Sequence, residues 1–294
     1  MTSSIPPVMQ CGQRVRRLLA MLVFTLSAEA LAATETDPLV ISISPFLAPQ
    51  VLLKNYAPMD AYLNKKLGRS VSFVTAPDYR TYNDRILHNS PAFLIAISSS
   101  AQLAIEDKGY IPFLRPANDT HPTLIVSLGS PVEAVKDLRG RVVATTDAMG
   151  IVAMQANAML THAGLAPGQD TTVRYLANHG AAINHVITHD VDAAVVSDRA
   201  LAQMPQPQRQ AVRVVADWAP GAAPGVVYLA RSDITAEQIA EITNALIDFV
   251  TNTADGRALM DTSGYGGLKP TDAKELRFLS PFAAELRALM KANQ

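Results

Sequence analysis

The chain has 294 residues, of which 49% are hydrophobic and only 17% are charged, and its formal net charge is −1. This composition excludes intrinsic disorder, which requires low hydrophobicity and a high net charge. It also argues against a protein that binds nucleic acid electrostatically, because no basic surplus exists to displace counterions from the phosphates.

The N-terminal segment has the pattern of a secretory signal peptide, which we place at residues 1–32. A basic stretch at 14–17 precedes the apolar run 18–24, and small residues end the segment before a cleavage site after Ala32. The apolar run is shorter than the roughly 20 residues that span a bilayer. An uncleaved anchor is the alternative. Cleavage would remove Cys11, the only cysteine. We therefore expect an exported periplasmic protein that has no disulfide and does not span the membrane.

The remaining chain alternates between short β-rich runs and amphipathic stretches. The C-terminal part is helical, and its first helix opens with a capping-box pattern at 235–238. Strands are predicted at 40–44, 70–75, 93–97, 124–128, 142–145, 173–177, 193–196, 212–216 and 226–230, and helices at 50–67, 79–87, 101–107, 150–162, 181–188, 235–251 and 272–291.

Strands spaced by helices predict an α/β fold with mostly parallel sheets and helices on both faces. Two extended segments, near 124–129 and 220–227, would join two such units. The C-terminal helices would then fold back onto the first unit. The expected division is a first lobe of residues 38–126 and 226–294 and a second lobe of residues 127–225.

Motifs that carry catalysis are nearly absent: the sequence has no dinucleotide-binding or Walker loop, no nucleophile elbow and no zincin motif. His185 and His189 are four residues apart, a spacing that can place two imidazoles on one helical face for Zn²⁺. However, Asp190 and Asp192 lead into a strand, so the helix should end near His189. Surface histidines favoured by the helix dipole are the better interpretation. We expect no catalytic residue, no metal and no cofactor.

Polar side chains at the ends of strands are candidate ligand contacts, because open α/β sheets bind ligands at the carboxyl ends of their strands. Ser98 and Ser99 follow one strand and could line the crevice, cap the next helix, or do both. Asp198 follows another strand, and its alternative role is the N-cap of the turn that comes next.

Three aromatic residues are also candidates. Trp218, the only tryptophan, lies in the second extended segment, where packing between the lobes is the simpler role. Tyr79 opens a helix at the mouth of a loop, and core packing is its alternative. Phe46 lies on the loop that leaves the first strand.

Several segments together resemble the phosphate/phosphite/phosphonate-binding (PhnD-like) periplasmic proteins. They follow one another in the order of that family over nearly the whole mature chain. The matching segments are 41–68, the Asp-Tyr pair at 78–79, 137–144, 160–165, 178–182 and 191–195.

The resemblance implies a two-lobed solute-binding protein of an ABC transporter, with the type II periplasmic binding architecture and an oxyanion held between the lobes. By match of position, Phe46, Tyr79, Thr146, Asp147 and His179 would line the cleft. We expect no enzymatic activity and a monomer that delivers its ligand to an ABC permease.

The loop at 147–150 departs from the family, whose Ser-Thr-Ser-Gly here reads Asp-Ala-Met-Gly. In the family, hydroxyls, free helix N–H groups and the helix dipole converge on the anion. Asp147 would instead repel an anion about 4 Å away by roughly 4 kcal/mol at an effective dielectric constant of about 20. Asp147 could also cap the helix. A less charged, neutral or amine-bearing ligand is therefore expected to fit better than a phosphonate dianion.

Two other functions share part of this pattern. A protein of the same fold could signal to a membrane histidine kinase rather than supply a permease. A periplasmic hydrolase that uses Asp198 or His179 is the third hypothesis.

Overall fold

The computed structural model describes residues 1–2, 38–47, 49–88 and 90–292. The proposed signal peptide and its cleavage site lie outside the described residues. Pro38–Gln294 form one compact unit that contains two β-sheets flanked by helices, and the account below concerns this unit.

The first sheet has six strands in the order β11-β4-β10-β3-β1-β2. Strand β1 is parallel to both of its neighbours, β2 and β3, whereas β10 runs antiparallel to β3 and β4, and β11 antiparallel to β4. Their bounds are β1 (Leu39–Ile43), β2 (Val71–Thr75), β3 (Phe93–Ala96), β4 (Ile111–Pro116), β10 (Val227–Ala230) and β11 (Leu268–Pro270).

The second sheet has five strands in the order β7-β6-β8-β5-β9. Here β6 is parallel to β7 and β8, while β5 runs antiparallel to β8 and β9. The bounds are β5 (Pro122–Ser127), β6 (Val142–Thr145), β7 (Thr172–Tyr175), β8 (Ala193–Ser197) and β9 (Val212–Asp217).

Helices cover the sheets through apolar stripes. In α2, the residues Leu52, Tyr56, Met59 and Leu63 recur at helical spacing and are buried against the first sheet and α9. Within the described residues, none of the helices combines the length and apolarity needed to cross a bilayer. The helices are α2 (Pro49–Leu67), α3 (Tyr79–Leu87), α4 (Ser98–Lys108), α5 (Ile151–His162), α6 (His179–Ile187), α7 (Asp198–Gln203), α8 (Gln206–Gln210), α9 (Ala236–Asn252), α10 (Ala254–Ser263) and α11 (Ser280–Ala292).

Two chain segments, at 117–121 and 218–226, connect the sheets and lie side by side. We call these two segments the crossing. Thr120 and Ala223 form an antiparallel bridge between them. A helix from each half also donates a hydrogen bond to the second of these segments. The Ser98 hydroxyl of α4 donates to the carbonyl of Pro224, and the Gln155 side-chain amide of α5 donates to the carbonyl of Gly221. The crossing is therefore tied to both halves by hydrogen bonds.

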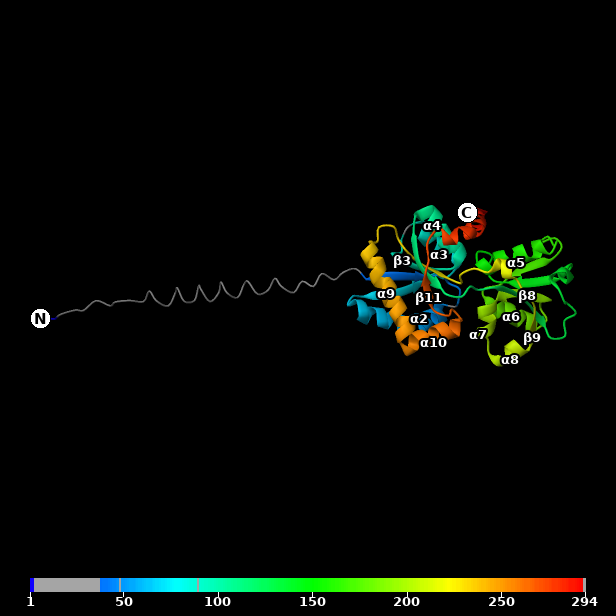
Figure 1. Cartoon of the computed structure of the whole chain (residues 1–294), viewed down its shortest axis with the longest axis horizontal. Coiled ribbons are helices and arrows are strands. Elements are labelled where there is room, and N and C mark those ends of the chain that lie inside the picture. The colour runs from blue at the N-terminus through cyan, green and yellow to red at the C-terminus, as the bar shows by residue number, and fades with distance from the viewer. Residues whose placement is uncertain (3–37, 48, 89, 293–294) are drawn as a thin grey trace. The chain divides into compact units, whose positions relative to one another are not determined.

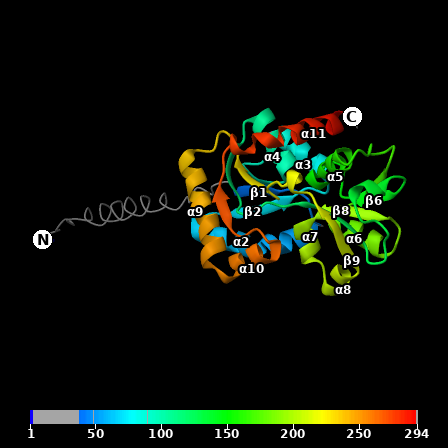
Figure 2. The same cartoon turned by 45° about the vertical axis from the view of Figure 1, so that its right-hand side comes forward.

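The C-terminal helix α11 also joins the halves. It packs against α4 of the first half and α5 of the second (Figure 2). Its buried residues Ala283, Leu286 and Met290 belong to the same hydrophobic cluster as Leu160 of α5 and Leu103 of α4. Figure 1 shows the two groups of elements that this helix connects, with α2, α9 and α10 in one and α6, α7 and α8 in the other.

The predicted α/β fold of the type II periplasmic binding class is confirmed in its two sheets and flanking helices. The sheets are mixed rather than mostly parallel, because β5 and β10 enter directly from the crossing segments and need no helical crossover. The strand β5 belongs to the second sheet, so the chain changes sheet somewhat before the expected residue 126. The residue limits of the lobes otherwise stay a prediction.

Candidate ligand-binding site

A cavity of about 400 Å³ lies between the two halves of the described unit. Its size falls in the range of about 300–1,000 Å³ that is usual for small-molecule sites. Most lining residues follow the carboxyl ends of parallel strands, which is where open sheets bind ligands. The cavity is lined by residues 46–47 after β1, Tyr79 after β2, Ile97 after β3, Thr146 and residues 150–152 after β6, residues 178–180 after β7, Ser197, residues 199–200 and residues 203–204 at and after the end of β8, residues 223–226 of the crossing, and by Val51, Asn55, Thr120, Gln155 and Tyr265.

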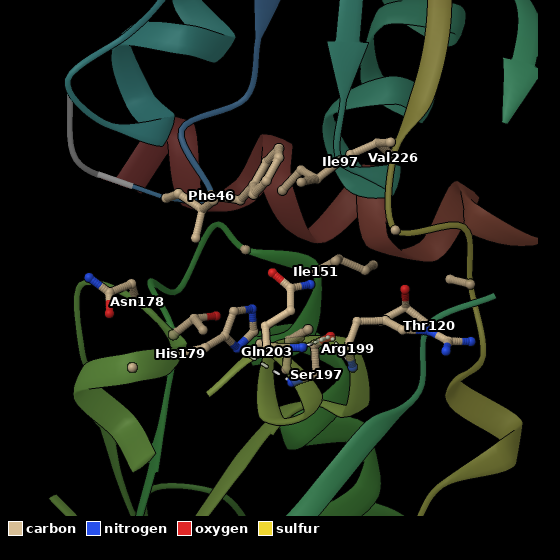
Figure 3. Close-up of a pocket in the computed structure, with 18 of the residues that line it drawn as sticks. Phe46, Ile97, Thr120, Ile151, Asn178, His179, Ser197, Arg199, Gln203 and Val226 are labelled. Atoms are coloured by element: carbon tan, nitrogen blue, oxygen red, sulfur yellow. Dashed lines mark hydrogen bonds between the residues drawn. The ribbon is translucent and has the colours of Figure 1, made fainter. Parts of the chain in front are cut away.

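The two sides of the cavity differ in chemistry. Figure 3 shows Phe46, Ile97 and Val226 of the first half on one side. On the opposite side it shows a group from the second half that carries hydrogen-bonding atoms, made of Asn178, His179, Ser197 and Arg199. An apolar wall therefore faces a polar one.

The N-terminus of α5 also lines the cavity. Gly150 is the N-cap and contributes no side-chain cap. Among the hydrogen bonds of the described residues, none uses the N–H of Ile151 or Val152 or the hydroxyl of Thr146, and all three residues line the cavity. Unpaired N–H groups at a helix N-terminus carry partial positive charge and are suited to bind an anion.

His179, the first residue of α6, presents a neutral imidazole to the same wall. Its Nδ1 accepts a hydrogen bond of 3.4 Å from the N–H of Ser197, so the ring proton resides on Nε2. Burial lowers the pKa of this imidazole to about 4. The side chain is thus an uncharged hydrogen-bond donor at neutral pH.

Among the described residues that line the cavity, Arg199 of α7 carries a fixed charge and none is an aspartate or glutamate. Its guanidinium donates to the carbonyl of Asp119 at 3.0 Å, and its Nε lies 3.5 Å from a carboxylate oxygen of Asp198. These contacts hold the arginine at the edge of the cavity while leaving a cation there. The wall is therefore suited to an oxyanion.

Four of the predicted contact residues line the cavity, namely Phe46, Tyr79, Thr146 and His179. Tyr79 opens α3 behind the N-cap Asp78, and only 8% of it is exposed. Its pKa is raised well above the ordinary value, first by burial and then by the charge of Asp147.

The other predicted contacts do not line the cavity. Ser98 and Ser99 lie fully buried in the first turn of α4, where their hydroxyls donate to the carbonyls of Pro224 and Met149. Neither caps the helix, whose N-cap is Ile97. They stabilise the backbone around the cavity instead.

Asp147 also lies outside the cavity lining. Its Oδ1 accepts from the N–H of Met149 at 2.8 Å, a bond within the loop that leaves the first N–H groups of α5 free. Asp147 therefore does not cap α5, and the expected direct repulsion of an anion by a carboxylate in the cleft does not apply. Its charge contributes to the raised pKa of Tyr79, after burial. The preference for an amine-bearing ligand loses its basis.

Asp198 supports the crossing segments rather than the cavity. Its carboxylate accepts from the N–H of His121 at 3.0 Å and from the N–H of Arg199 at 2.8 Å. The N-cap of α7 is Ser197, whose hydroxyl accepts from the N–H of Arg199 and Ala200. The expected capping role thus falls to the preceding residue.

Trp218 packs at the crossing between the sheets. A Cβ on Gly221 would lie 2.4 Å from the indole ring, so the close turn of residues 218–221 requires glycine there. The ring centroid of Trp218 lies 6.3 Å from the ring centroid of His162 on α5. The packing role is the one observed.

The paired histidines do not form a metal site. The helix α6 ends at Ile187, so His189 lies beyond it with a left-handed φ of 60°, and the two imidazoles do not share a helical face. In the part of the chain that the structure describes, no cluster of three or more metal-ligating side chains is found.

A family model described as ABC transporter, phosphonate, periplasmic substrate-binding protein matches residues 41–276. The chain belongs to this family. The resemblance drawn from the sequence segments is thereby confirmed, and the role of the protein is solute binding. The family is one of binding proteins and not of enzymes, and neither the sensory nor the hydrolytic alternative is favoured by the match.

Solved structures share the fold at low sequence identity. A binding component of an ABC phosphonate transporter from Pseudomonas aeruginosa is 16% identical with a TM-score of 0.72, over 87% of this chain and 94% of that one. PhnD1 from Prochlorococcus marinus, in complex with methylphosphonate, is 12% identical with a TM-score of 0.73, over 85% and 98%. The aliphatic sulphonate binding protein SsuA from Escherichia coli is 19% identical with a TM-score of 0.59, over 87% of each chain.

Proposed function

We propose that the protein works in the periplasm, after removal of residues 1–32, as a monomer that captures an oxyanion between its two lobes. The observation that carries this proposal is the set of donors that line the cavity: free N–H groups of α5, a donor imidazole and one arginine, with no aspartate or glutamate among the described lining residues. The ligand would then pass to the permease of an ABC transporter, as the family membership suggests.

The proposed roles follow from the chemistry of the wall. Arg199 would supply the charge, and Thr146 and His179 would donate hydrogen bonds to the oxygens. Phe46 and Tyr79 would cover the ligand from the first half. Ser98, Ser99, Asp147, Asp198 and Trp218 would act indirectly, by holding the loops and the crossing in place.

Calorimetric titration of the mature protein with methylphosphonate and with inorganic phosphate tests the proposal. Because a hydrogen bond to a charged group contributes about 1.5–3 kcal/mol, Arg199→Gln should weaken binding by about 10- to 100-fold. Arg277→Gln, at an exposed arginine remote from the cavity lining, is the matched control and should leave the affinity unchanged.

The absence of binding by any phosphonate, sulfonate or phosphate to the folded protein would refute the oxyanion proposal. Equal affinities of the wild type and Arg199→Gln would show that the arginine does not contact the ligand.

A further inference from the structure

The two halves also meet at a place remote from α11. Helix α7 of the second half packs against α10 of the first half, on the side of the unit opposite α11 (Figures 1 and 2). Beside this contact lies a groove of about 220 Å³, lined by Arg199, Ala202, Gln203 and residues 261–264. The two helices are therefore not packed along their whole length, and the close contact is confined to part of them.

Arg199 of α7 reaches from the second half to the first. Its Nη2 donates to the carbonyl of Asp119 at 3.0 Å, and its side chain lies against the backbone of Gly264 at the end of α10. A Cβ on Gly264 would lie 2.9 Å from both the Cδ and the Nη1 of Arg199. Burial raises the pKa of the adjacent Tyr265 to about 12, and the charge of Arg199 opposes this rise. The arginine approaches this closely because residue 264 has no side chain.

The backbone under Arg199 is fixed within the first half. Gly264 ends α10 with a left-handed φ of 66°, and its carbonyl accepts from the side-chain amide of Asn118 at 3.2 Å. The N–H groups of Ala117 and Asn118 donate to the carbonyls of Gly267 and Tyr265 at 2.9 and 3.0 Å. Residues 264–267 therefore form a defined surface on which the arginine lies.

The carbonyl that accepts from Arg199 is fixed by a second arginine. Arg115 of β4 donates to the carboxylate of Asp119 at 2.7 Å and to the carboxylate of Glu275 at 2.8 Å. The side chain of Arg115 is only 10% exposed, so this pairing is weakly screened by salt. Asp119 is thus bound to the first half through its carboxylate, while its carbonyl accepts from the second half.

We propose that Arg199 and Gly264 form a latch that holds the two halves closed over the cavity. The side chain belongs to the second half, where a carboxylate oxygen of Asp198 lies 3.5 Å from its Nε, and it contacts the backbone of the first half. Because Arg199 also lines the cavity, the latch fixes its charge there, and Gly264 is a positioning residue. The latch requires no particular ligand, whereas its effect on affinity rests on the proposed function.

Two glycine variants separate the latch from backbone strain. Gly264→Ala places a methyl group against Arg199. Gly109→Ala is the matched control, because Gly109 ends α4 with a φ of 67° and a Cβ there would meet no atom of the described residues within 4 Å. Both variants impose the same left-handed strain on a helix end, so a difference between them reports the contact with Arg199.

Small-angle X-ray scattering of the mature protein without added ligand measures closure. The radius of gyration of Gly264→Ala should exceed that of Gly109→Ala, because the halves separate when the latch is lost. Calorimetry adds a second readout. Gly264→Ala should bind methylphosphonate about tenfold more weakly than Gly109→Ala, a loss equivalent to one hydrogen bond to a charged group.

Asn118→Ala reaches the latch without a change at the glycine. It removes the hydrogen bond to the carbonyl of Gly264, so it should change the radius and the affinity in the same direction by a smaller amount. Asn118 is exposed, and substitutions at exposed positions usually have little effect on folding. If Gly264→Ala does not fold, the comparison is made between Asn118→Ala and the wild type.

The outcomes separate the latch from the oxyanion function. Equal radii of gyration in Gly264→Ala and Gly109→Ala overturn the latch, and methylphosphonate binding by the wild type would then leave the oxyanion function intact. If the wild type binds neither methylphosphonate nor inorganic phosphate, the oxyanion function fails. A larger radius in Gly264→Ala supports the latch in that case too.

Discussion

Because the imidazole of His179 is held neutral by burial, it makes the free energy of unfolding depend on pH. Its pKa in the folded protein is about 4, below the ordinary value of 6.5, because burial disfavours the charged form. Between these values the unfolded chain binds a proton that the folded chain does not. The free energy of unfolding therefore decreases as the pH falls from 6.5 towards 4.

The variant His179→Gln should lose less stability than the wild type between pH 7.5 and pH 5. We expect a difference of about 1 kcal/mol. At about 1.4 kcal/mol per unit, the 1.5 pH units between pH 6.5 and pH 5 would give about 2 kcal/mol, but the ring borders a cavity open to water, which reduces the effect. Urea unfolding at the two pH values measures it, with the exposed His88→Gln as the control. Identical pH dependence of wild type and His179→Gln would contradict the assignment.

Gly150 permits the close approach of Thr146 to the N-terminus of α5. A Cβ at this position would lie 3.0 Å from both the Thr146 hydroxyl and the carbonyl oxygen of Asp147. Gly150→Ala should therefore displace the hydroxyl and weaken oxyanion binding by about tenfold, the equivalent of one hydrogen bond. Titration calorimetry checks this, and Gly129→Ala, whose Cβ would meet no atom within 4 Å, should bind as the wild type does.

Sequence reasoning located the part of the site that the family motifs cover. Phe46, Tyr79, Thr146 and His179 follow strand ends, and all four line the cavity. Arg199 is not among the residues predicted from the sequence, which favoured the adjacent Asp198. The signal was present, since a helix begins directly after the buried strand that ends at Ser197 and places its first residues at the carboxyl edge of the sheet.

The direction of a side chain could not be derived in the same way. Whether Asp147 faces the cleft depends on a single hydrogen bond inside its loop, and the sequence does not specify which N–H it takes. The same holds for Asp198, which bonds to a residue 77 positions away along the chain.

At the scale of the elements, α11 packs against both halves. Leu286 is fully buried in the cluster shared by both halves. Leu286→Ala should lower the free energy of unfolding by about 3 kcal/mol, through lost burial and the cavity that remains. Thermal unfolding measures the effect, and Phe278→Ala, 53% exposed just before this helix, should change it little. If Leu286→Ala lowered the free energy of unfolding as little as Phe278→Ala does, Leu286 would not be part of the core.

Prolines explain the main element that the sequence did not reveal. The strand β4 contains Pro112 and Pro116, and proline argues against a strand interior because it donates no hydrogen bond. The structure places this strand between β10 and the short edge strand β11, where its remaining groups are paired. Tertiary pairing thus outweighs the local propensity.

At the scale of the whole molecule, the shared cluster predicts that the two halves unfold together. Differential scanning calorimetry of the mature protein should show one transition. A ligand at 100 times its Kd adds about 2.7 kcal/mol, which should raise the Tm by about 5–10 °C. Two transitions, of which only one moves with ligand, would mean that the halves fold independently and that the site lies within one of them.

The strand order also has a consequence for the folding of a chain that becomes available N-terminus first. All strands of the second sheet come from one continuous stretch of chain, Pro122–Asp217. The first sheet, by contrast, needs β10 between β3 and β4, although both of those strands are made long before it. A nascent chain can therefore complete the later sheet first. The earlier strands must wait, with an open edge, until nearly the entire polypeptide has emerged.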